Sequence, residues 1–252
     1  MRPNAEASAI PGAPPGAFKF VWGVFGTVMG VLYTAVAAPL AALLAPFSHG
    51  FYSNSWVGRW WAWLIIMTCG VKVELEGLHN IAGLKSFVLV TNHQSFFDIF
   101  AVLAYMPRDV RFMAKKELLK IPVFGLALKR SGHIIVDRQR GGPTVRQAIE
   151  LGNRGLCICI FAEGHRFDDN QVHPFQPGAA WLAIQTKLPC VPMAISGSGA
   201  FFPRGAKVVV PGGRMRLSLG APIPTSDLRS TDRAALTEQL ESAVHARFLP
   251  AL

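Results

Sequence analysis

The stretch SFVLVTNHQSFFD, which runs from Ser86 to Asp98, decides the fold. Its first six residues form a short apolar run that ends at a polar turn, which is the pattern of a buried β-strand. The residues from Ser95 to Ala104 then predict a helix. Because α/β proteins form their sites in loops at the ends of strands, we expect functional side chains between this strand and this helix.

The same patterns predict further elements on either side of this stretch. The other strand candidates are Val71–Glu76, Val110–Met113, His133–Val136, Leu156–Phe161, Val191–Ile195, Lys207–Val210 and Arg214–Leu219. The other helix candidates are Pro122–Lys129, Thr144–Asn153, Gly178–Thr186 and Asp232–Phe248. Since strands and helices largely alternate, the sequence predicts an α/β fold in which helices flank a mixed central sheet.

The composition indicates contact with lipid. Hydrophobic residues make up 51% of the 252 residues and charged residues 16%, whereas soluble domains have roughly 25% charged residues. The net charge of +10 predicts an anionic partner. The apolar composition favours an anionic lipid surface over nucleic acid as that partner. Four cysteines without zinc-site spacing, Cys69, Cys157, Cys159 and Cys190, are expected to be free thiols facing a reducing cytoplasm.

The N-terminal part contains the membrane segment. No charged residue occurs from Phe20 to Phe47, and about 20 apolar residues suffice to cross the hydrocarbon core of a bilayer. A signal peptide fits this stretch less well, because its end lacks a cleavage site. A second apolar stretch, Trp56–Gly70, carries a tryptophan cluster (Trp60, Trp61 and Trp63) suited to the headgroup boundary.

Three parts of the chain follow from these patterns: a mobile tail over 1–17, a membrane-associated helical segment over 18–70 and one catalytic domain over 71–252. With Pro39 and Pro46 in the helical segment, either a single crossing or a hairpin within one leaflet satisfies the backbone hydrogen bonds. The region from Glu6 to Glu74 has no carboxylate between its ends, and the domain is rich in Lys and Arg. This charge pattern agrees with a domain that lies on a cytoplasmic, anionic membrane surface. We expect that membrane to be a bacterial inner membrane.

His93 and Asp98 form the first candidate for chemistry. On a continuous helix, residues five positions apart diverge by about 140°, so the two can meet only if His93 lies in the loop before the helix. Asp98 would then fix the imidazole tautomer, and the other ring nitrogen could take a proton from an alcohol. Alternatively, Ser95 and Asp98 form a capping box and His93 is an incidental loop residue. Taken alone, this stretch leaves both interpretations open.

Four blocks in order make the chain resemble the glycerolipid acyltransferases, specifically the lysophosphatidic acid acyltransferase family. Asn92–Asp98 matches the N-H-x-x-x-x-D signature, and Lys115–Gly125 looks like the second motif. The run Phe161–Phe167, FAEGHRF, resembles the third motif, F-P-E-G-T-R-S, and Val191–Met193 looks like the fourth. The resemblance extends over roughly residues 70 to 225.

This resemblance implies a membrane-bound O-acyltransferase. Such an enzyme moves a fatty acyl group from acyl-CoA or acyl carrier protein (acyl-ACP) to the sn-2 hydroxyl of lysophosphatidic acid and forms phosphatidic acid. The catalytic pair would be His93 and Asp98, and the expected partners are the lysophospholipid, the thioester donor and membrane lipids, without nucleic acid. Neither a cofactor nor an acyl-enzyme is expected, since the donor is a co-substrate.

The resemblance also assigns substrate-binding residues. Glu163, Gly164 and Arg166 would bind the glycerol phosphate of the acceptor, and the planar guanidinium of Arg166 matches a phosphate. Lys115 and Arg138 would add positive charge around that phosphate or around the phosphopantetheine arm of the donor. The alternative for these two cations is a solvated basic face. A backbone amide near Gly164 is a candidate donor to the oxyanion.

Departures from the third motif leave the acceptor open. Ala162 stands where the family has Pro, His165 where it has Thr, and Phe167 where it has Ser. Lyso-ornithine lipid, another lysophospholipid or glycerol 3-phosphate therefore remain alternative acceptors. A noncatalytic lipid-binding protein with the same fold is the alternative from another class, and it would be expected to lack His93 or Asp98.

Two other kinds of site are not supported by spacing. His133, His165 and His173 include no pair at i, i+4, and the chain has no HExxH motif, so we expect no metal site. The run Ser196-Gly197-Ser198-Gly199 is not a G-x-S-x-G elbow, which argues against a nucleophilic serine.

Overall fold

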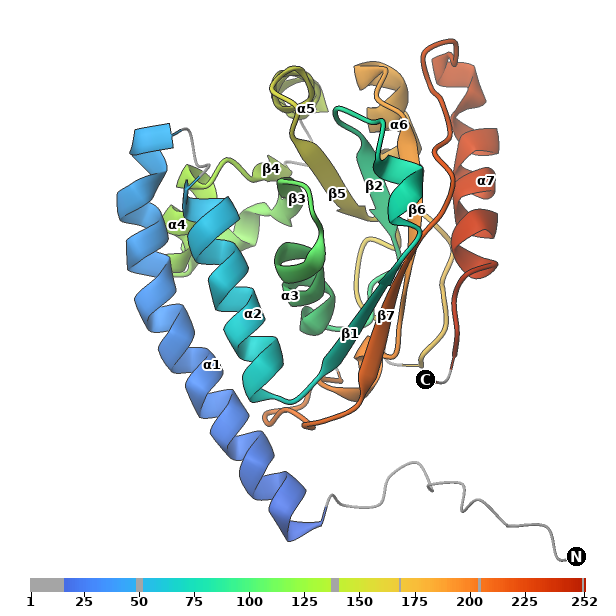
Figure 1. The fold of residues 1–252 in the computed structure, drawn as a ribbon. Helices are drawn as coiled ribbons and strands as arrows, with labels where there is room; N and C mark the ends of the chain where they lie inside the picture. The colour runs from blue at the N-terminus through green and yellow to red at the C-terminus, as the bar shows by residue number, and fades with distance from the viewer. Residues whose placement is uncertain (1–15, 49–51, 137–140, 168, 204, 251) are drawn as a thin grey trace, which may run out of the picture.

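A seven-stranded mixed sheet separates two helical layers (Figure 1). The computed structural model describes residues 16–48, 52–136, 141–167, 169–203, 205–250 and 252. The sheet order is β1-β7-β6-β2-β5-β3-β4, and the pair β6–β7 is antiparallel whereas the other neighbours are parallel. The strands are β1 (Lys72–Glu76), β2 (Val88–Thr91), β3 (Val110–Lys115), β4 (Ile134–Val136), β5 (Cys157–Phe161), β6 (Cys190–Ser196) and β7 (Arg214–Leu219). The predicted fold class is confirmed.

Helices cover both faces of this sheet. One layer contains α1 (Ala17–Leu44), α2 (Arg59–Thr68), α3 (Phe96–Tyr105) and α4 (Phe124–Arg130), and the other contains α5 (Gly141–Asn153), α6 (Gly178–Thr186) and α7 (Arg233–His245). Short helical turns connect them: η1 (Ala45–Ser48), the wider η2 (Tyr52–Gly58), η3 (Leu78–Ile81), η4 (Lys116–Lys120), η5 (Ser198–Ala200) and η6 (Ser230–Asp232).

The central strands are apolar because both of their faces are buried. In β2, Val88 and Val90 face the core beneath α5, α6 and α7, whereas Leu89 faces the core beneath α2 and α3. Successive side chains of a strand point to opposite faces, so a continuous apolar run serves two cores at once. This explains why the stretch that begins at Ser86 predicts a buried strand correctly.

The predicted strand Lys207–Val210 is wrong. Its backbone amides find partners outside the sheet: Val209 N donates to Thr27 Oγ1 at 3.0 Å, and Val210 N donates to the Phe201 carbonyl at 2.8 Å. The segment is therefore a loop that docks on α1. Its apolar residues pack on a helix from the other end of the sequence, which a local pattern cannot reveal.

Helix α1 is attached to the body along most of its length. Near its start, Trp22 Nε1 donates to the Thr68 carbonyl at 2.8 Å. In the middle, Trp61 Nε1 donates to Thr34 Oγ1 at 3.0 Å, and near its end Arg130 donates to the Ala42 carbonyl at 3.2 Å. These contacts extend over about 20 residues, or roughly 30 Å of helix.

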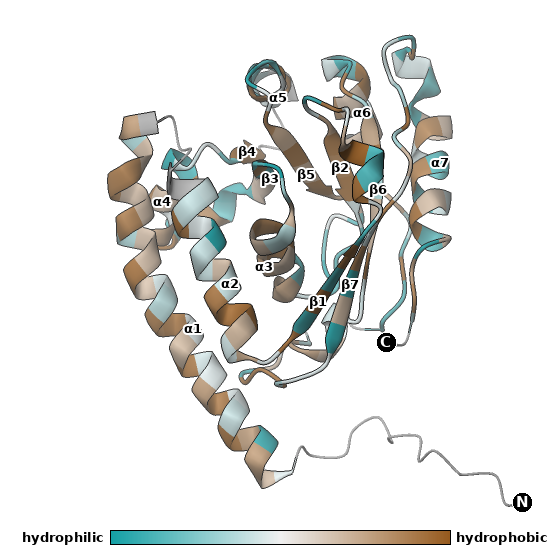
Figure 2. Cartoon of the chain, in the orientation of Figure 1, coloured by the Kyte–Doolittle hydropathy of each residue, from teal (hydrophilic) through white to brown (hydrophobic). Residues whose placement is uncertain are grey.

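The opposite side of α1 is an exposed apolar stripe, which Figure 2 shows as apolar colour along the helix. Its members recur every three or four residues, as one face of a helix requires. They are Val21, Phe25, Val28, Leu32, Val36, Leu40, Leu43 and, just beyond the helix, Phe47. The segment Ala17–Phe47 is long and apolar enough to cross a membrane by length and composition.

The tryptophan cluster of α2 is divided between the surface and the core. Trp60 and Trp63 are exposed and meet edge to face at 5.4 Å. Trp61 instead packs edge to face on Phe100 at 5.1 Å. Two of the three indoles are thus available to a membrane interface, while the third joins α2 to α3.

The close approach of α1 to the body generates a prediction about Gly23. A Cβ added there would lie 2.2 Å from the Val209 carbonyl oxygen, whereas a Cβ at Gly30 on the same helix would meet nothing within 4 Å. Helix propensity favours Ala over Gly by about 1 kcal/mol, but overpacking costs about 1–3 kcal/mol. We expect Gly23→Ala to lower the melting temperature in detergent and Gly30→Ala, the matched control, to leave it equal or higher. Equal melting temperatures for the two variants would show that α1 is not packed in this way.

Candidate active site

The candidate site residues gather at one edge of the sheet. Strands β2, β5 and β3 are parallel neighbours, so their carboxyl ends lie together. His93 follows the end of β2, Glu163 follows the end of β5, and Lys115 is the last residue of β3. Loops far apart in the sequence are thereby brought to one place, as the strand-end rule predicts.

His93 and Asp98 are in direct contact. His93 Nδ1 lies 2.8 Å from Asp98 Oδ2, and the carboxylate is fully buried while the imidazole is 13% exposed. An ionised carboxylate only accepts hydrogen bonds, so Nδ1 carries the proton. The other ring nitrogen, Nε2, is then an acceptor and can take a proton from a substrate.

The capping box between Ser95 and Asp98 that the sequence suggested is also present. Ser95 is the N-cap of α3, its Oγ accepts from Phe97 N at 3.3 Å, and its own N–H donates to Asp98 Oδ2 at 2.9 Å. Gln94 N donates to the same oxygen at 2.8 Å. The cap holds Asp98 where it reaches the imidazole, so the capping box and the His93–Asp98 contact occur together.

The imidazole is also fixed by ring stacking. His93 stacks on Phe161 with 3.8 Å between centroids and 19° between planes. Phe161 in turn lies nearly parallel to Phe112 of β3, 5.9 Å away. The hydrogen bond to Asp98 and this stack together leave the ring little freedom to rotate.

Glu163 connects the His93 loop to the loop after β5. Its side chain is almost completely buried, at 1% exposure. One carboxylate oxygen accepts from His93 N at 3.0 Å and the other from His173 N at 3.1 Å. Burial raises the pKa of Glu163 to about 7, although both backbone hydrogen bonds oppose this change. Its contact with the acceptor stays a prediction, whereas both contacts in the structure are internal.

Of the other predicted binding residues, Gly164 and Arg166 follow Glu163 on the loop after β5. Gly164 has φ of +78°, which favours glycine, and its N–H already donates to the Phe161 carbonyl at 3.2 Å. The guanidinium of Arg166 lies 3.8 Å from the centroid of the Phe96 ring, within cation–π range. Lys115 is exposed. Arg138 lies outside the described residues.

Two other histidines, His133 and His173, make their contacts with neighbouring protein groups. His133 is buried, its Nδ1 accepts from Phe112 N at 3.1 Å, and burial lowers its pKa to about 3. His173 pairs with Asp169 at 2.8 Å and stacks on Phe167. Within the described ranges, no group of three or more His, Cys, Asp or Glu residues could hold a metal ion. The four cysteines are buried free thiols.

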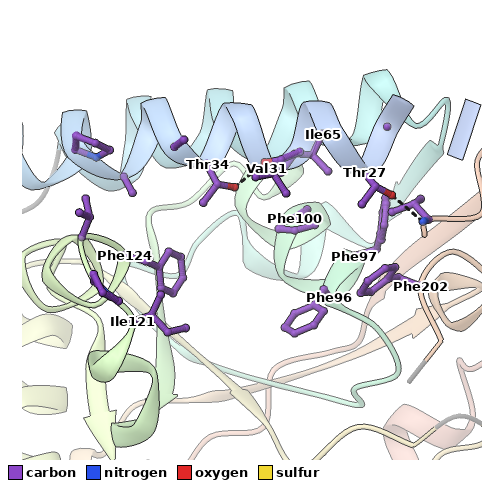
Figure 3. Close-up of a pocket in the computed structure, with 18 residues that line it drawn as sticks. Thr27, Val31, Thr34, Ile65, Phe96, Phe97, Phe100, Ile121, Phe124 and Phe202 are labelled. Carbon is purple, nitrogen blue, oxygen red and sulfur yellow. Dashed lines mark hydrogen bonds between the residues drawn. The ribbon is translucent and has the colours of Figure 1, made fainter. Parts of the chain in front are cut away.

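An apolar pocket of about 720 Å³ begins beside this site (Figure 3). Its walls come from α1, α2 and α3, from the turn at 121–124 and from the segment after η5, and include Val31, Phe96, Phe100, Ile121 and Phe202. Phe96 lies three residues after His93, lines this pocket and carries the guanidinium of Arg166 over its ring, so it is in contact with both the pocket and a cation. The volume is typical of small-molecule sites, which have about 300–1,000 Å³.

Sequence reasoning did not identify α1 as a wall of the pocket. The sequence nevertheless contains an indication that α1 packs closely on another element, because Gly23, Gly26 and Gly30 recur at helical spacing. Small residues at such spacing let a helix and its neighbour approach closely. Gly23 and Gly26 are buried against the body, and Gly26 and Gly30 line the pocket.

Comparison with known proteins finds acyltransferases among the relatives of this chain. The family model described as Acyltransferase matches residues 72–196. The chain is 28% identical over 227 residues to human 1-acyl-sn-glycerol-3-phosphate acyltransferase beta, covering 86% of this chain and 81% of that enzyme. It is 29% identical to the 1-acyl-sn-glycerol-3-phosphate acyltransferase of Pseudomonas aeruginosa, covering 78% and 72%. The sheep alpha enzyme is 30% identical over 69% of this chain, but only 62% of that enzyme is matched.

A solved structure has the same fold. The 1-acyl-sn-glycerophosphate acyltransferase PlsC of Thermotoga maritima superposes with a TM-score of 0.74 at 24% identity, covering 91% of this chain and 95% of that one. This likeness concerns the fold, whereas the family match covers the strands and loops that carry His93, Asp98 and Glu163. The chain belongs to the acyltransferase family that includes the 1-acyl-sn-glycerol-3-phosphate acyltransferases.

Proposed function

We propose that this chain transfers a fatty acyl group from acyl-CoA or acyl-ACP to the sn-2 hydroxyl of lysophosphatidic acid, forming phosphatidic acid. The observation that carries this proposal is the position of the His93–Asp98 pair beside an apolar pocket, with Arg166 at the boundary between them. The acceptor is supported by the names of the related enzymes from human and Pseudomonas aeruginosa.

The geometry supports direct transfer without an acyl-enzyme. His93 Nε2 takes the proton of the acceptor hydroxyl while the hydroxyl oxygen attacks the thioester carbonyl carbon. The carbon–sulfur bond then breaks, and the leaving thiolate takes the proton from the imidazolium. An ester and a free thiol result. Asp98 stabilises the imidazolium through the 2.8 Å hydrogen bond to Nδ1.

Each part of the substrates has a matching surface. The apolar pocket takes the acyl chain, since its walls are formed by phenylalanines and aliphatic side chains. The guanidinium of Arg166 takes the acceptor phosphate, for which its planar fork is suited. Phe96 contacts both surfaces, so in this proposal the headgroup and the acyl chain part at Phe96. Gly164, Lys115 and Arg138 remain predicted contacts of the phosphate or of the donor.

The packing of α1 favours attachment to one leaflet over a crossing. The body contacts α1 over roughly 30 Å, which is the full thickness of the hydrocarbon core. A crossing α1 would therefore pull polar parts of the catalytic body into the hydrocarbon. With the exposed stripe of α1 immersed in one leaflet, the body stays at the interface where its lipid substrates are located.

Glu163 acts in this proposal by positioning the base. Its carboxylate binds the backbone N–H of His93 and of His173, so it ties the catalytic loop to the loop that carries Arg166. A negative carboxylate would also repel a phosphate. We therefore assign its effect on the acceptor to the placement of these two loops.

One prediction concerns the reaction itself. Purified protein in vesicles that contain lysophosphatidic acid is expected to release thiol from acyl-CoA or acyl-ACP and to form phosphatidic acid. His93→Ala should lower the rate about 10²- to 10⁴-fold, the range typical of general bases. Asp98→Asn should also lower the rate, because an amide can stabilise the wrong tautomer. The control is His79→Ala, which changes an exposed histidine. An undiminished rate in His93→Ala would refute the mechanism.

Acceptor profiling distinguishes the alternatives. Lysophosphatidic acid, glycerol 3-phosphate and lyso-ornithine lipid are compared at equal concentrations with each donor. We expect lysophosphatidic acid to be preferred and Arg166→Leu to weaken the apparent affinity for the phosphate-bearing acceptors. A preference for lyso-ornithine lipid would reassign the acceptor, and lipid binding without thiol release from any donor would support the noncatalytic alternative.

A further prediction concerns how the stability of the protein depends on pH. With the pKa of Glu163 raised from 4.5 to about 7, the folded state holds a proton that the unfolded state releases. The free energy of unfolding should therefore fall as pH rises from about 4.5 to 7, by up to about 3 kcal/mol. Glu163→Gln should lack this fall in denaturant titrations in detergent. The exposed Glu150→Gln is the control, and parallel curves for wild type and Glu163→Gln would contradict the assignment.

A further inference from the structure

The catalytic body exposes an apolar ridge of its own. Leu118, Ile121, Val123 and Leu126 lie in or around η4 and α4, and their exposed fractions are 36%, 47%, 48% and 45%. We call these four residues the 118–126 ridge. Single exposed apolar residues are ordinary, but several gathered within nine residues mark an interaction surface.

The backbone of the ridge is held in a strained turn. Val123 has φ of +62° and ψ of −52°, and Phe124 N donates to the Pro122 carbonyl at 2.6 Å. This is the geometry of the rare classic γ-turn, which is especially unfavourable for a β-branched residue. Gly125 permits the turn, because a Cβ there would lie 2.4 Å from the Leu119 carbonyl oxygen. The fold thus accepts strain while it presents Val123 outward.

The ridge forms one side of the pocket mouth. Ile121 and Val123 line the apolar pocket and are at the same time about half exposed. Across the pocket, Val31 of α1 also lines the wall and is exposed. Figure 3 shows Val31 on α1 and Ile121 on the opposite side of the pocket. The mouth is therefore apolar on both sides and continuous with the outer surface of α1.

Cations accompany the ridge. Lys116, Lys120, Lys129 and Arg130 are exposed on η4 and α4, and Glu117 is the single acidic residue from 115 to 130. A surface that combines apolar side chains with an excess of Lys and Arg fits the interface of an anionic leaflet. A protein partner would fit the apolar residues but would leave these cations unexplained.

We infer that the 118–126 ridge inserts into the same anionic lipid leaflet as α1, so that the pocket opens directly into the hydrocarbon. This inference rests on the proposed function for the identity of the lipid substrates, but the insertion is a property of the surface. Membrane contact is then made on both sides of the mouth. An acyl chain can pass between leaflet and pocket without crossing water.

A depth-sensitive probe tests this directly. The four natural cysteines are buried, so a cysteine introduced by Leu126→Cys can be labelled with an environment-sensitive fluorophore. The full chain is bound to vesicles of phosphatidylcholine and phosphatidylglycerol. We expect a blue-shifted emission that is quenched by lipids with a doxyl group on the acyl chain. Ile149→Cys on α5, where Ile149 is 38% exposed, is the matched control and should remain unshifted and unquenched.

The charge contribution is tested with the same probe. Lys120→Glu combined with Lys129→Glu should reduce the quenching at residue 126 in phosphatidylglycerol vesicles, and added salt should do the same in the wild-type background. A second label site, Leu118→Cys, guards against a local disturbance of α4. Emission at 118 and 126 that matches the aqueous control at 149 would overturn the inference.

The result of the labelling experiment does not depend on the result of the reaction assay. A ridge that is quenched by doxyl lipids in a chain that acylates no acceptor would leave the insertion standing and refute the proposed function. Conversely, an active enzyme whose ridge labels remain aqueous would preserve the proposed function and refute the insertion.

Discussion

One buried carboxylate oxygen organises the site. Asp98 Oδ2 accepts hydrogen bonds from His93 Nδ1, Gln94 N and Ser95 N, all between 2.8 and 2.9 Å. A buried charge is costly unless it is paired and hydrogen-bonded, and these three donors, with the start of α3, supply that compensation. The same atom therefore begins the helix, shapes the loop and orients the His93 imidazole. A change at Asp98 would disturb all three.

The parallel sheet determines which residues can meet His93. Because β2 lies beside β5, the loop after β5 lies next to His93, and Glu163 can reach the backbone N–H of His93. Because β5 lies beside β3, Phe112 supports Phe161, which supports the imidazole. Strand order thus converts sequence-distant residues into one rigid arrangement, and rigid placement is what general base catalysis requires.

The sequence was sufficient wherever the deciding contacts are local. The buried run before Thr91, the cap at Ser95 and the pair His93–Asp98 depend on neighbours within a few residues, and the strands and helices around them were predicted with small shifts of their bounds. The sequence was not sufficient where the hydrogen-bond partner of a residue lies far away along the chain. Val209 donates to Thr27 of α1 instead of to a strand, and Glu163 uses both oxygens on backbone amides. Neither partner is visible in a pattern of apolar and polar residues.

In the proposed reaction, Phe96 marks the boundary between the polar and the apolar part of the lipid substrates. Its ring lines the apolar pocket and also lies under the guanidinium of Arg166. A phosphate drawn deeper would lose its hydration against phenylalanines, and an acyl chain drawn outward would displace water from a charged group. Both displacements cost free energy, so a lipid settles with its polarity boundary at Phe96. In the proposed reaction the acceptor hydroxyl lies at that boundary, and His93, which precedes Phe96 by three residues in the loop before α3, receives its proton.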